Sequence, residues 1–268
     1  MPHHPTAVLH EATRIDETTT IGPYAVIEDG VEIGPHCLVG EHAVLRAGTV
    51  LGARCHIDAH AVVGGLPQDL SFHPSTPSGV RLGEGVVLRE NVTINRATTE
   101  GAFTEIGAGS MLMACAHVGH DCRIGEHVIL ANNVLVAGKV SIGDHAFVGG
   151  GAAFHQFVRV GESAMVSGLS RCAVDLPPFC ITAERSELIG LNLVGLKRRG
   201  IERESIREVK KLYHLVFATE GRPGVLAAGI LADGVAKTGE GKRFLHFLSG
   251  KSKRGIMRPR RKDRSAEE

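Results

Sequence analysis

One stretch decides the fold of this chain: RIGEHVILANNVLVAGKVSIGDHAFVGG, residues 123–150. An α-helix repeats about every 3.6 residues and a flat strand every two, but here an aliphatic side chain recurs at every sixth position. These positions are Ile124, Leu130, Val136, Ile142 and Val148. A strict hexapeptide repeat predicts a parallel β-helix, in which each short strand buries one aliphatic side chain before a tight turn.

The same period extends in both directions along the chain. It covers residues 15–63, returns over 82–94 and continues over 106–166, with Phe154 as its one aromatic member. Glycine often follows the aliphatic residue, as a corner with unusual backbone angles requires. A small or β-branched residue stands two positions before it. This second register fits the narrow interior of a triangular coil.

The repeat is interrupted at two places and then ends. Segments 64–81 and 95–105 depart from the pattern, and the repeat stops near Pro177 and Pro178. We therefore predict a β-helix domain over residues 1–183 with inserted loops at 64–81 and 95–105, and a C-terminal helical domain over 184–268. Apolar periodicity places helices over 188–199, 202–220, 225–237 and 244–248.

Composition narrows the class of protein. Thirty basic and 29 acidic side chains almost balance, which argues against a broad nucleic-acid surface. The segment 251–262 is strongly basic, and we expect it to be a frayed, solvated tail.

The cysteines and the hydropathy pattern indicate a cellular compartment. The six cysteines occur singly, without metal-ligand spacing, so we expect core positions in a reducing compartment and no disulfides. We find no signal peptide and no apolar run near about 18 residues. The expectation is a cytoplasmic protein without stable membrane insertion.

A candidate site follows from the geometry of the coil. Three hexapeptides make one turn, so residues 18 apart should stack on adjacent coils. In the segment AHVGHDC, residues 116–122, this places His120 above Gly138 and Gly138 above Gln156, with His155 in the neighbouring column. Asp121 follows His120, and a carboxylate near an imidazole can fix its tautomer. One wall therefore offers an imidazole, a residue without a side chain, an amide and a second imidazole.

The residues alone leave other hypotheses open. His117, His120 and His155 could hold a metal, although no acidic ligand joins them at suitable spacing. A non-catalytic scaffold would share the β-helix, but predicts regular outward threonines and no loops. A carbonic-anhydrase-like metalloenzyme would share it too, and requires zinc.

An ordered set of motifs resembles one acyltransferase family. The motifs are PQDL (67–70), RENVTINRAT (89–98), AHVGHDC (116–122), ILANN (129–133), HQF (155–157), DLPPF (175–179) and GLKRRG (195–200). They are similar to those of the acyl-carrier-protein-dependent UDP-N-acetylglucosamine O-acyltransferases that begin lipid A biosynthesis, within the hexapeptide-repeat acyltransferase superfamily. The repeat specifies only the superfamily, whereas the ordered inserts favour the O-acyltransferase over its N-acyltransferase relative.

The resemblance implies a fold, an assembly and a reaction. It implies a left-handed parallel β-helix, a homotrimer with active sites between subunits, and transfer of an (R)-3-hydroxyacyl chain from acyl carrier protein to the 3-hydroxyl of UDP-N-acetylglucosamine. His120 resembles the general base, Asp121 its supporting carboxylate, and Gly138 the residue whose backbone N–H stabilises the oxyanion. The donor's phosphopantetheine carries the acyl group, so no further cofactor or metal is expected.

The resemblance also implies binding residues. Asp69, His117, His155 and Gln156 resemble sugar and phosphate contacts, Asn192, Arg198 and Arg199 resemble nucleotide contacts, and Gly168 resembles the position that sets acyl-chain length. Three residues depart from the best-known members: Ser71 replaces a lysine, Lys139 a histidine, and Val194 a glutamate that holds the ribose. An alternative is therefore a related enzyme acting on a 3-amino sugar nucleotide or using another acyl donor.

Overall fold

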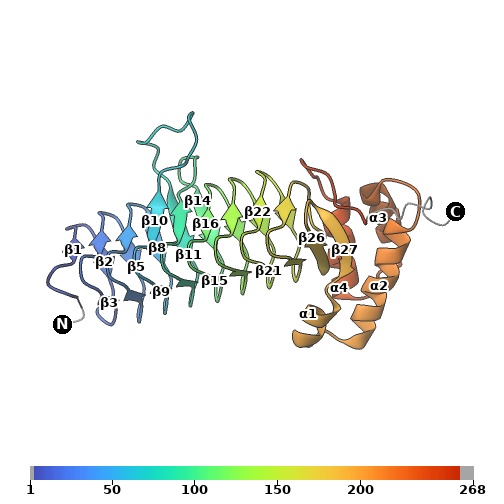
Figure 1. Ribbon diagram of the computed structural model, residues 1–268, viewed down its shortest axis with the longest axis horizontal. Helices are drawn as coiled ribbons and strands as arrows, with labels where there is room; N and C mark the ends of the chain where they lie inside the picture. The colour runs from blue at the N-terminus through green and yellow to red at the C-terminus, as the bar shows by residue number, and fades with distance from the viewer. Residues whose placement is uncertain (1–2, 260–268) are drawn as a thin grey trace.

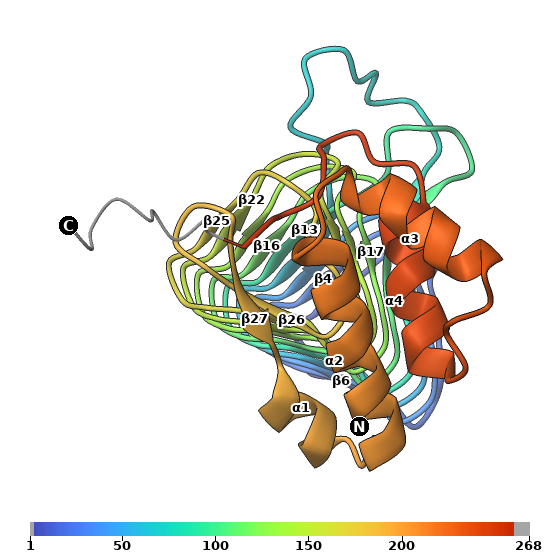
Figure 2. The same cartoon turned by 90° about the vertical axis from the view of Figure 1, so that its right-hand side faces the viewer.

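The chain winds into a long three-walled solenoid that carries a small group of helices at one end (Figure 1). The computed structural model describes residues 3–259. Through its first 25 strands the chain visits the three walls in rotation, so every third strand lies in the same sheet, and the last two strands both join the third wall. Viewed along its axis, the solenoid is a prism with three corners (Figure 2). The predicted left-handed parallel β-helix with a C-terminal helical part is confirmed.

The first wall is a nine-stranded parallel sheet. Its strands are β1 (Val8–Leu9), β4 (Val26–Ile27), β7 (Val44–Leu45), β10 (Val62–Gly65), β13 (Thr93–Asn95), β16 (His117–Val118), β19 (Leu135–Val136), β22 (Ala153–Phe154) and β25 (Arg171–Cys172).

The second wall has eight parallel strands. They are β2 (Arg14–Ile15), β5 (Glu32–Ile33), β8 (Thr49–Leu51), β11 (Gly79–Leu82), β14 (Phe103–Ile106), β17 (Arg123–Ile124), β20 (Ser141–Ile142) and β23 (Arg159–Val160).

The third wall has ten strands, of which the last pairs antiparallel. They are β3 (Thr20–Ile21), β6 (Leu38–Val39), β9 (His56–Ile57), β12 (Val87–Leu88), β15 (Met111–Leu112), β18 (Ile129–Leu130), β21 (Phe147–Val148), β24 (Met165–Val166), β26 (Cys180–Ala183) and β27 (Glu187–Leu191).

The hexapeptide aliphatic residues form the core. Ile27, Leu45, Ile57, Leu88 and Leu130 are completely buried. Most strands contain two residues, of which the second points inward and the first outward. Apolar burial along the whole axis is the main stabilising term of such a solenoid, because each coil contacts only its neighbours.

The stacking interval of 18 residues is confirmed where the repeat is unbroken, and the inserts lengthen it elsewhere. His117 pairs with Leu135, which pairs with Ala153. Across the first insert Val62 pairs with Thr93, and across the second Thr93 pairs with His117. Both inserts leave from the corner between the first and second walls, which we call the first–second corner (Figure 2).

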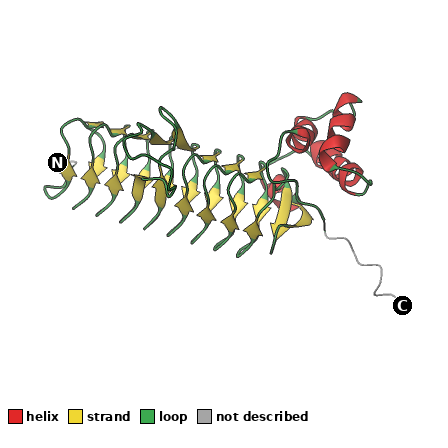
Figure 3. Cartoon of the chain, turned by 90° about the horizontal axis from the view of Figure 1, so that it is seen from above, coloured by secondary structure: helices red, strands yellow, loops and turns green. Residues whose placement is uncertain are grey.

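The C-terminal helices are α1 (Leu193–Arg198), α2 (Arg203–Phe217), α3 (Pro223–Ala232) and α4 (Gly239–Ser249), gathered at one end of the strands (Figure 3). The helix expected over 188–199 is wrong in its first half, because Glu187–Leu191 forms an antiparallel pair with β26 and so belongs to the third wall. No helix among residues 3–259 has the length and hydrophobicity that a bilayer crossing needs.

The described part of the basic tail is docked on the solenoid. Met257 is buried and its N–H donates to the carbonyl of Asp175. The carboxylate of Asp175, itself fully buried, forms an ion pair with Arg159. The expectation of a frayed, solvated tail is therefore wrong for residues 254–259, whereas residues 251–253 are exposed and residues 260–262 lie outside the described part.

The cysteines follow the prediction with one exception. Cys37, Cys55, Cys122, Cys172 and Cys180 are buried and free. Cys115, however, is exposed, because it occupies a turn position outside the strand register.

Candidate active site

The segment AHVGHDC forms the turn from β16 to β17, at the first–second corner. His120 is 6% exposed there, and its Nδ1 lies 2.7 Å from Oδ2 of Asp121. Asp121 adopts a left-handed conformation, with φ of 59°. This turn conformation lets two residues adjacent in sequence direct their side chains toward each other, which an extended strand would prevent.

Asp121 is fixed by the second insert. The N–H and hydroxyl of Thr98 donate to its two carboxylate oxygens at 2.9 and 2.7 Å, and its own N–H donates to Oγ1 of Thr104. Burial opposes ionisation, but the hydrogen bonds from His120 and Thr98 outweigh it and hold the pKa of Asp121 below its ordinary value. An ionised Asp121 only accepts, so Nδ1 of His120 carries the shared proton and Nε2 is left as a base.

Gly138 lies directly against that base. A Cβ on Gly138 would come within 2.4 Å of Nε2 and 2.6 Å of Cε1 of His120, so only glycine fits beside this imidazole. Among residues 3–259 no acceptor receives the Gly138 N–H. At the corresponding turn position the Glu126 N–H donates to Asp144, so this donor position can hold an oxygen. A base and a vacant N–H donor therefore lie side by side.

The two groups line a cleft of about 300 Å³ on the first wall. His117 and Gln156 line it as predicted, together with Gln68 from the first insert. The imidazole Nδ1 of His117 lies 2.8 Å from Oγ1 of Thr93. Burial lowers the pKa of His117, which favours its neutral form.

Asp69 lies on the first insert near this cleft. Its Oδ1 accepts hydrogen bonds from the N–H and hydroxyl of Ser71, at 2.9 and 2.7 Å. These bonds lower the pKa of Asp69, and the positive charge of Lys139 contributes in the same direction. His155 is exposed in the neighbouring column, as the stacking interval predicts, but does not line the cleft.

The predicted nucleotide contacts lie elsewhere in the same chain. Asn192 caps α1 through the N–H of Gly195 and donates to the carbonyl of Ser163, and Arg199 donates to the Ser163 hydroxyl. Ser163 stands in the turn from β23 to β24, at the corner between the second and third walls. Arg198 is exposed at the end of α1. One chain therefore does not bring these residues to His120.

Gly168 also lies away from His120. It is exposed in the turn from β24 to β25, where the third wall meets the first. The nearest atom to a Cβ placed on it would be the carbonyl oxygen of Gly150, at 3.3 Å.

The residues at the cleft do not favour a cysteine nucleophile or a metal site. Burial raises the pKa of Cys122, two residues from His120, to about 12, and its thiol donates to the Ala137 carbonyl. A protonated, buried thiol is a poor nucleophile. Within residues 3–259 no three His, Cys, Asp or Glu side chains are grouped as a metal site.

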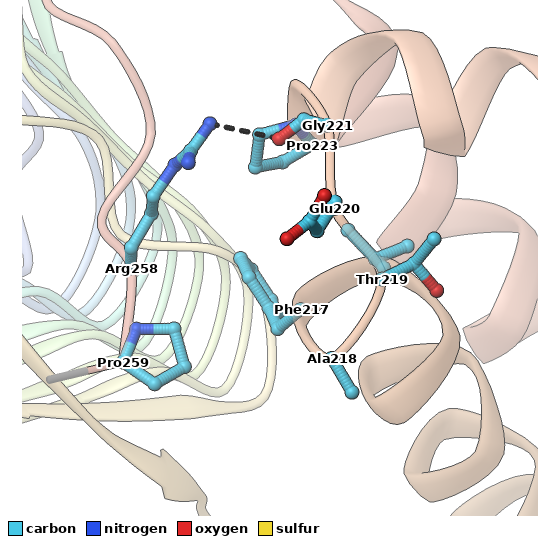
Figure 4. A pocket seen from close by; sticks show the side chains of 9 residues that line it. Phe217, Ala218, Thr219, Glu220, Gly221, Pro223, Arg258 and Pro259 are labelled. Carbon is cyan, nitrogen blue, oxygen red and sulfur yellow. Dashed lines mark hydrogen bonds between the residues drawn. The ribbon is translucent and has the colours of Figure 1, made fainter. Parts of the chain in front are cut away.

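A second hollow, of about 200 Å³, lies between the α2–α3 loop and the docked tail (Figure 4). Its charged side chains are Glu220 and Arg258, and Arg258 donates to the carbonyl of Gly221. The described residues that line it include no histidine, cysteine or lysine. It therefore offers no base comparable with His120.

The structure adds residues that the spacing missed. Thr98 holds Asp121, Thr93 contacts His117, and Asn95 and Gln68 line the cleft. All belong to the inserts or flank them, where the interval is no longer 18. The signal that could have found them was the motif RENVTINRAT, which contains three of the four.

Comparisons with known proteins agree with this geometry. Residues 12–47 and 103–138 match the bacterial transferase hexapeptide family, and residues 175–257 match domain 2 of UDP N-acetylglucosamine O-acyltransferase. The acyl-(acyl-carrier-protein)–UDP-N-acetylglucosamine O-acyltransferase of Anaeromyxobacter dehalogenans is 46% identical over 96% of this chain and 100% of its own. The UDP-N-acetylglucosamine acyltransferase of Campylobacter jejuni superposes with a TM-score of 0.89 at 34% identity, covering 96% and 100% of the two chains. The UDP-N-acetylglucosamine acyltransferase of Francisella novicida superposes with a TM-score of 0.90 at 29% identity, covering 97% of this chain and 95% of its own.

The β-helix, the His–Asp pair and the vacant N–H together define an acyltransferase of the hexapeptide-repeat class. The match of residues 175–257 and the coverage of the relatives over almost their whole length narrow this class. The chain belongs to the acyl-(acyl-carrier-protein)–UDP-N-acetylglucosamine O-acyltransferase family.

Proposed function

We propose that the protein transfers an (R)-3-hydroxyacyl chain from acyl carrier protein to the glucosamine 3-hydroxyl of UDP-N-acetylglucosamine, the first step of lipid A biosynthesis, in the cytoplasm. One observation carries the proposal. Nε2 of His120, oriented by Asp121, lies against Gly138, whose N–H has no acceptor among the described residues.

The proposed reaction needs these three groups. Nε2 of His120 removes the proton from the sugar hydroxyl, and the oxygen attacks the thioester carbon. The resulting oxyanion accepts from the Gly138 N–H. Its collapse forms the ester and expels the phosphopantetheine thiolate, which takes the proton back from His120. The base contributes about 10²- to 10⁴-fold and the N–H about 10²- to 10³-fold. A thioester is already a reactive acyl donor, so the proposal requires no metal or further cofactor.

We further propose a homotrimer, because the three walls differ in outward chemistry. The outward residues of the second wall are mainly charged, whereas those of the third are mainly apolar. On the third wall they include Leu38, Val87, Met111, Ile129 and Phe147.

The first wall presents an outward valine run to pair with that apolar surface, at Val8, Val26, Val44 and Val62. Packing the first wall of one subunit on the third wall of the next is a heterologous contact, which closes into a ring. The third–first corners then face the ring axis, and the charged second wall faces water.

This ring would complete the site. The outer edge of each inter-subunit cleft combines the first–second corner of one subunit, with His120, and the second–third corner of the next. Asn192 and Arg199 of the partner subunit would then reach the nucleotide, with Arg198 of the partner subunit beside them. Guanidinium groups suit a diphosphate.

The remaining substrate contacts follow from the same arrangement. Asp69, His117 and Gln156 contact the sugar on the His120 side of the cleft, and His155 contacts the substrate from the neighbouring column. The acyl chain runs toward the ring axis, where the third–first corner carries Gly168. A glycine there leaves room for a longer chain.

The test is acyl transfer by the purified protein. A panel of 3-hydroxyacyl carrier proteins of different lengths is offered with UDP-N-acetylglucosamine and with its 3-amino analogue, and product mass is measured. A hydroxyacyl product on UDP-N-acetylglucosamine supports the proposal. Acylation of the amine analogue alone would instead favour the 3-amino sugar enzyme, which the names of the relatives do not favour. Light scattering checks for three times the 28.4 kDa chain mass.

A further inference from the structure

A side chain with no assigned role forms part of the cleft floor. Asn95 ends β13, one coil before His120 on the N-terminal side, and lines the same cleft. It is 7% exposed. Thr93 pairs with His117 and Ile94 with Val118, so the next residue in the stacking column is Gly119, which has no side chain to donate to the Asn95 amide.

The orientation of the Asn95 amide is determined by its partner. One amide atom lies 2.9 Å from the carbonyl oxygen of Leu66, at the base of the first insert. A carbonyl oxygen only accepts, so this atom is the donor Nδ2. The other atom, Oδ1, is buried and has no hydrogen-bond partner among residues 3–259.

A buried carbonyl oxygen without a partner is costly, and an acceptor left open in a substrate cleft can be satisfied by a ligand. The loop contact uses only the donor half of the amide. The contact with Leu66 accounts for the donor Nδ2 but gives no role to the acceptor Oδ1.

The neighbours of Asn95 indicate which substrate supplies the donor. Its Nδ2 holds the carbonyl of Leu66, at the base of the insert that carries Asp69, and His117 lines the same cleft on the next coil. Asp69 and His117 are the proposed sugar contacts. The sugar rather than the acyl chain therefore contacts Asn95.

We propose that Oδ1 of Asn95 accepts a hydrogen bond from a hydroxyl or amide N–H of the acceptor sugar, and so positions its reacting hydroxyl at His120. The inference rests on the proposed function for the identity of the sugar. Asn95 is a positioning residue, because it holds the sugar and takes no part in proton transfer.

The first experiment is calorimetric binding of UDP-N-acetylglucosamine to the protein without an acyl donor. Asn95→Ala should raise Kd about tenfold, the scale of one hydrogen bond to a buried partner. Arg96→Ala is the matched control, because Arg96 donates to the carbonyl of Pro74 and anchors the same insert from the next position. Equal effects of the two variants would reduce Asn95 to a loop anchor and overturn the inference.

The second experiment identifies the sugar group. Binding is repeated with analogues that lack the 4- or 6-hydroxyl or carry an N-methylated acetamide. The affinity of the wild type should be about tenfold lower for one analogue than for UDP-N-acetylglucosamine. Asn95→Ala should bind that analogue and UDP-N-acetylglucosamine equally well. If Asn95→Ala weakens the binding of every analogue by the same factor relative to the wild type, the inference is overturned.

A third comparison separates the inference from the proposed reaction. In transfer assays, donors with and without the 3-hydroxyl should show the same ratio of rates in Asn95→Ala and wild type, and a changed ratio would place Asn95 on the acyl chain instead. If the protein binds the UDP sugar but transfers no acyl group, the proposed reaction is wrong, and the effect of Asn95→Ala on sugar binding can still be measured. Wild-type protein that binds no UDP sugar would defeat both.

Discussion

Replacing Gly138 by alanine tests the base without removing it. The new Cβ would lie 2.4 Å from Nε2 of His120, about 1 Å inside the ordinary contact range. The imidazole carries the contact with Asp121 at 2.7 Å, so a rotation that relieves the clash breaks that hydrogen bond. Alanine keeps the backbone N–H, and the oxyanion donor therefore remains.

We expect Gly138→Ala to lower kcat by at least about 100-fold, the lower part of the range for a positioned base. If the coils shift and the His120 imidazole stays in place, overpacking lowers the free energy of unfolding by about 1–3 kcal/mol. Steady-state transfer and the unfolding temperature are measured on the same preparation. Gly229→Ala is the control, since a Cβ on that α3 residue meets nothing within 4 Å. A folded Gly138→Ala protein whose kcat stays within threefold of wild type would refute the steric argument.

Four further outcomes follow from the same geometry. His120→Ala should remain a folded oligomer by light scattering and lose transfer by at least about 100-fold; retained activity removes His120 from the mechanism. Arg199→Ala should raise KM for the sugar nucleotide more than it lowers kcat, and an unchanged KM dismisses the phosphate contact. Thr98→Val removes one of the two donors that Thr98 provides to the Asp121 carboxylate, so kcat should fall about threefold to tenfold with KM unchanged; an equal kcat would show that the backbone bond suffices. Burial holds the pKa of His117 below the ordinary histidine value of 6.5, so its contribution to unfolding free energy is present above pH 6.5 and is lost as pH falls toward the lower folded value. His117→Gln should therefore flatten the acid side of the unfolding temperature against pH, and an unchanged slope contradicts this.

The solenoid was predictable because its physics is local and repetitive. Each coil needs one buried aliphatic residue per wall, so the period of six determines the strand positions, the interval of 18 and the column of His120, Gly138 and Gln156. The helices were less predictable. Leu188, Ile189 and Leu191 have apolar side chains that suit a helix as well as a strand, and pairing with β26 decides between them.

The inserts limited what the spacing could show of the site. Across the second insert the stacking interval becomes 24 residues, from Thr93 to His117. Stacking at 18 therefore could not bring Thr98 to Asp121 or Asn95 to the cleft. The tail was missed for another reason. Its charge suggested solvation, whereas the docking depends on the burial of Met257 and on hydrogen bonds to the backbone of Asp175, which lies far away in the sequence.

The geometry also relates two of the departures to each other. The best-known members that this chain resembles carry a lysine at the place of Ser71 and a histidine at the place of Lys139. Here Ser71 donates two hydrogen bonds to Asp69, and the positive charge of Lys139 still lowers the pKa of that carboxylate. The cation of this chain therefore stands on the coil, next to Gly138, rather than on the insert. Because the cation still acts on Asp69, the exchange preserves the local charge, and neither residue supplies the base or the oxyanion donor. These two departures therefore bear on how the insert and Asp69 are held rather than on His120 and Gly138.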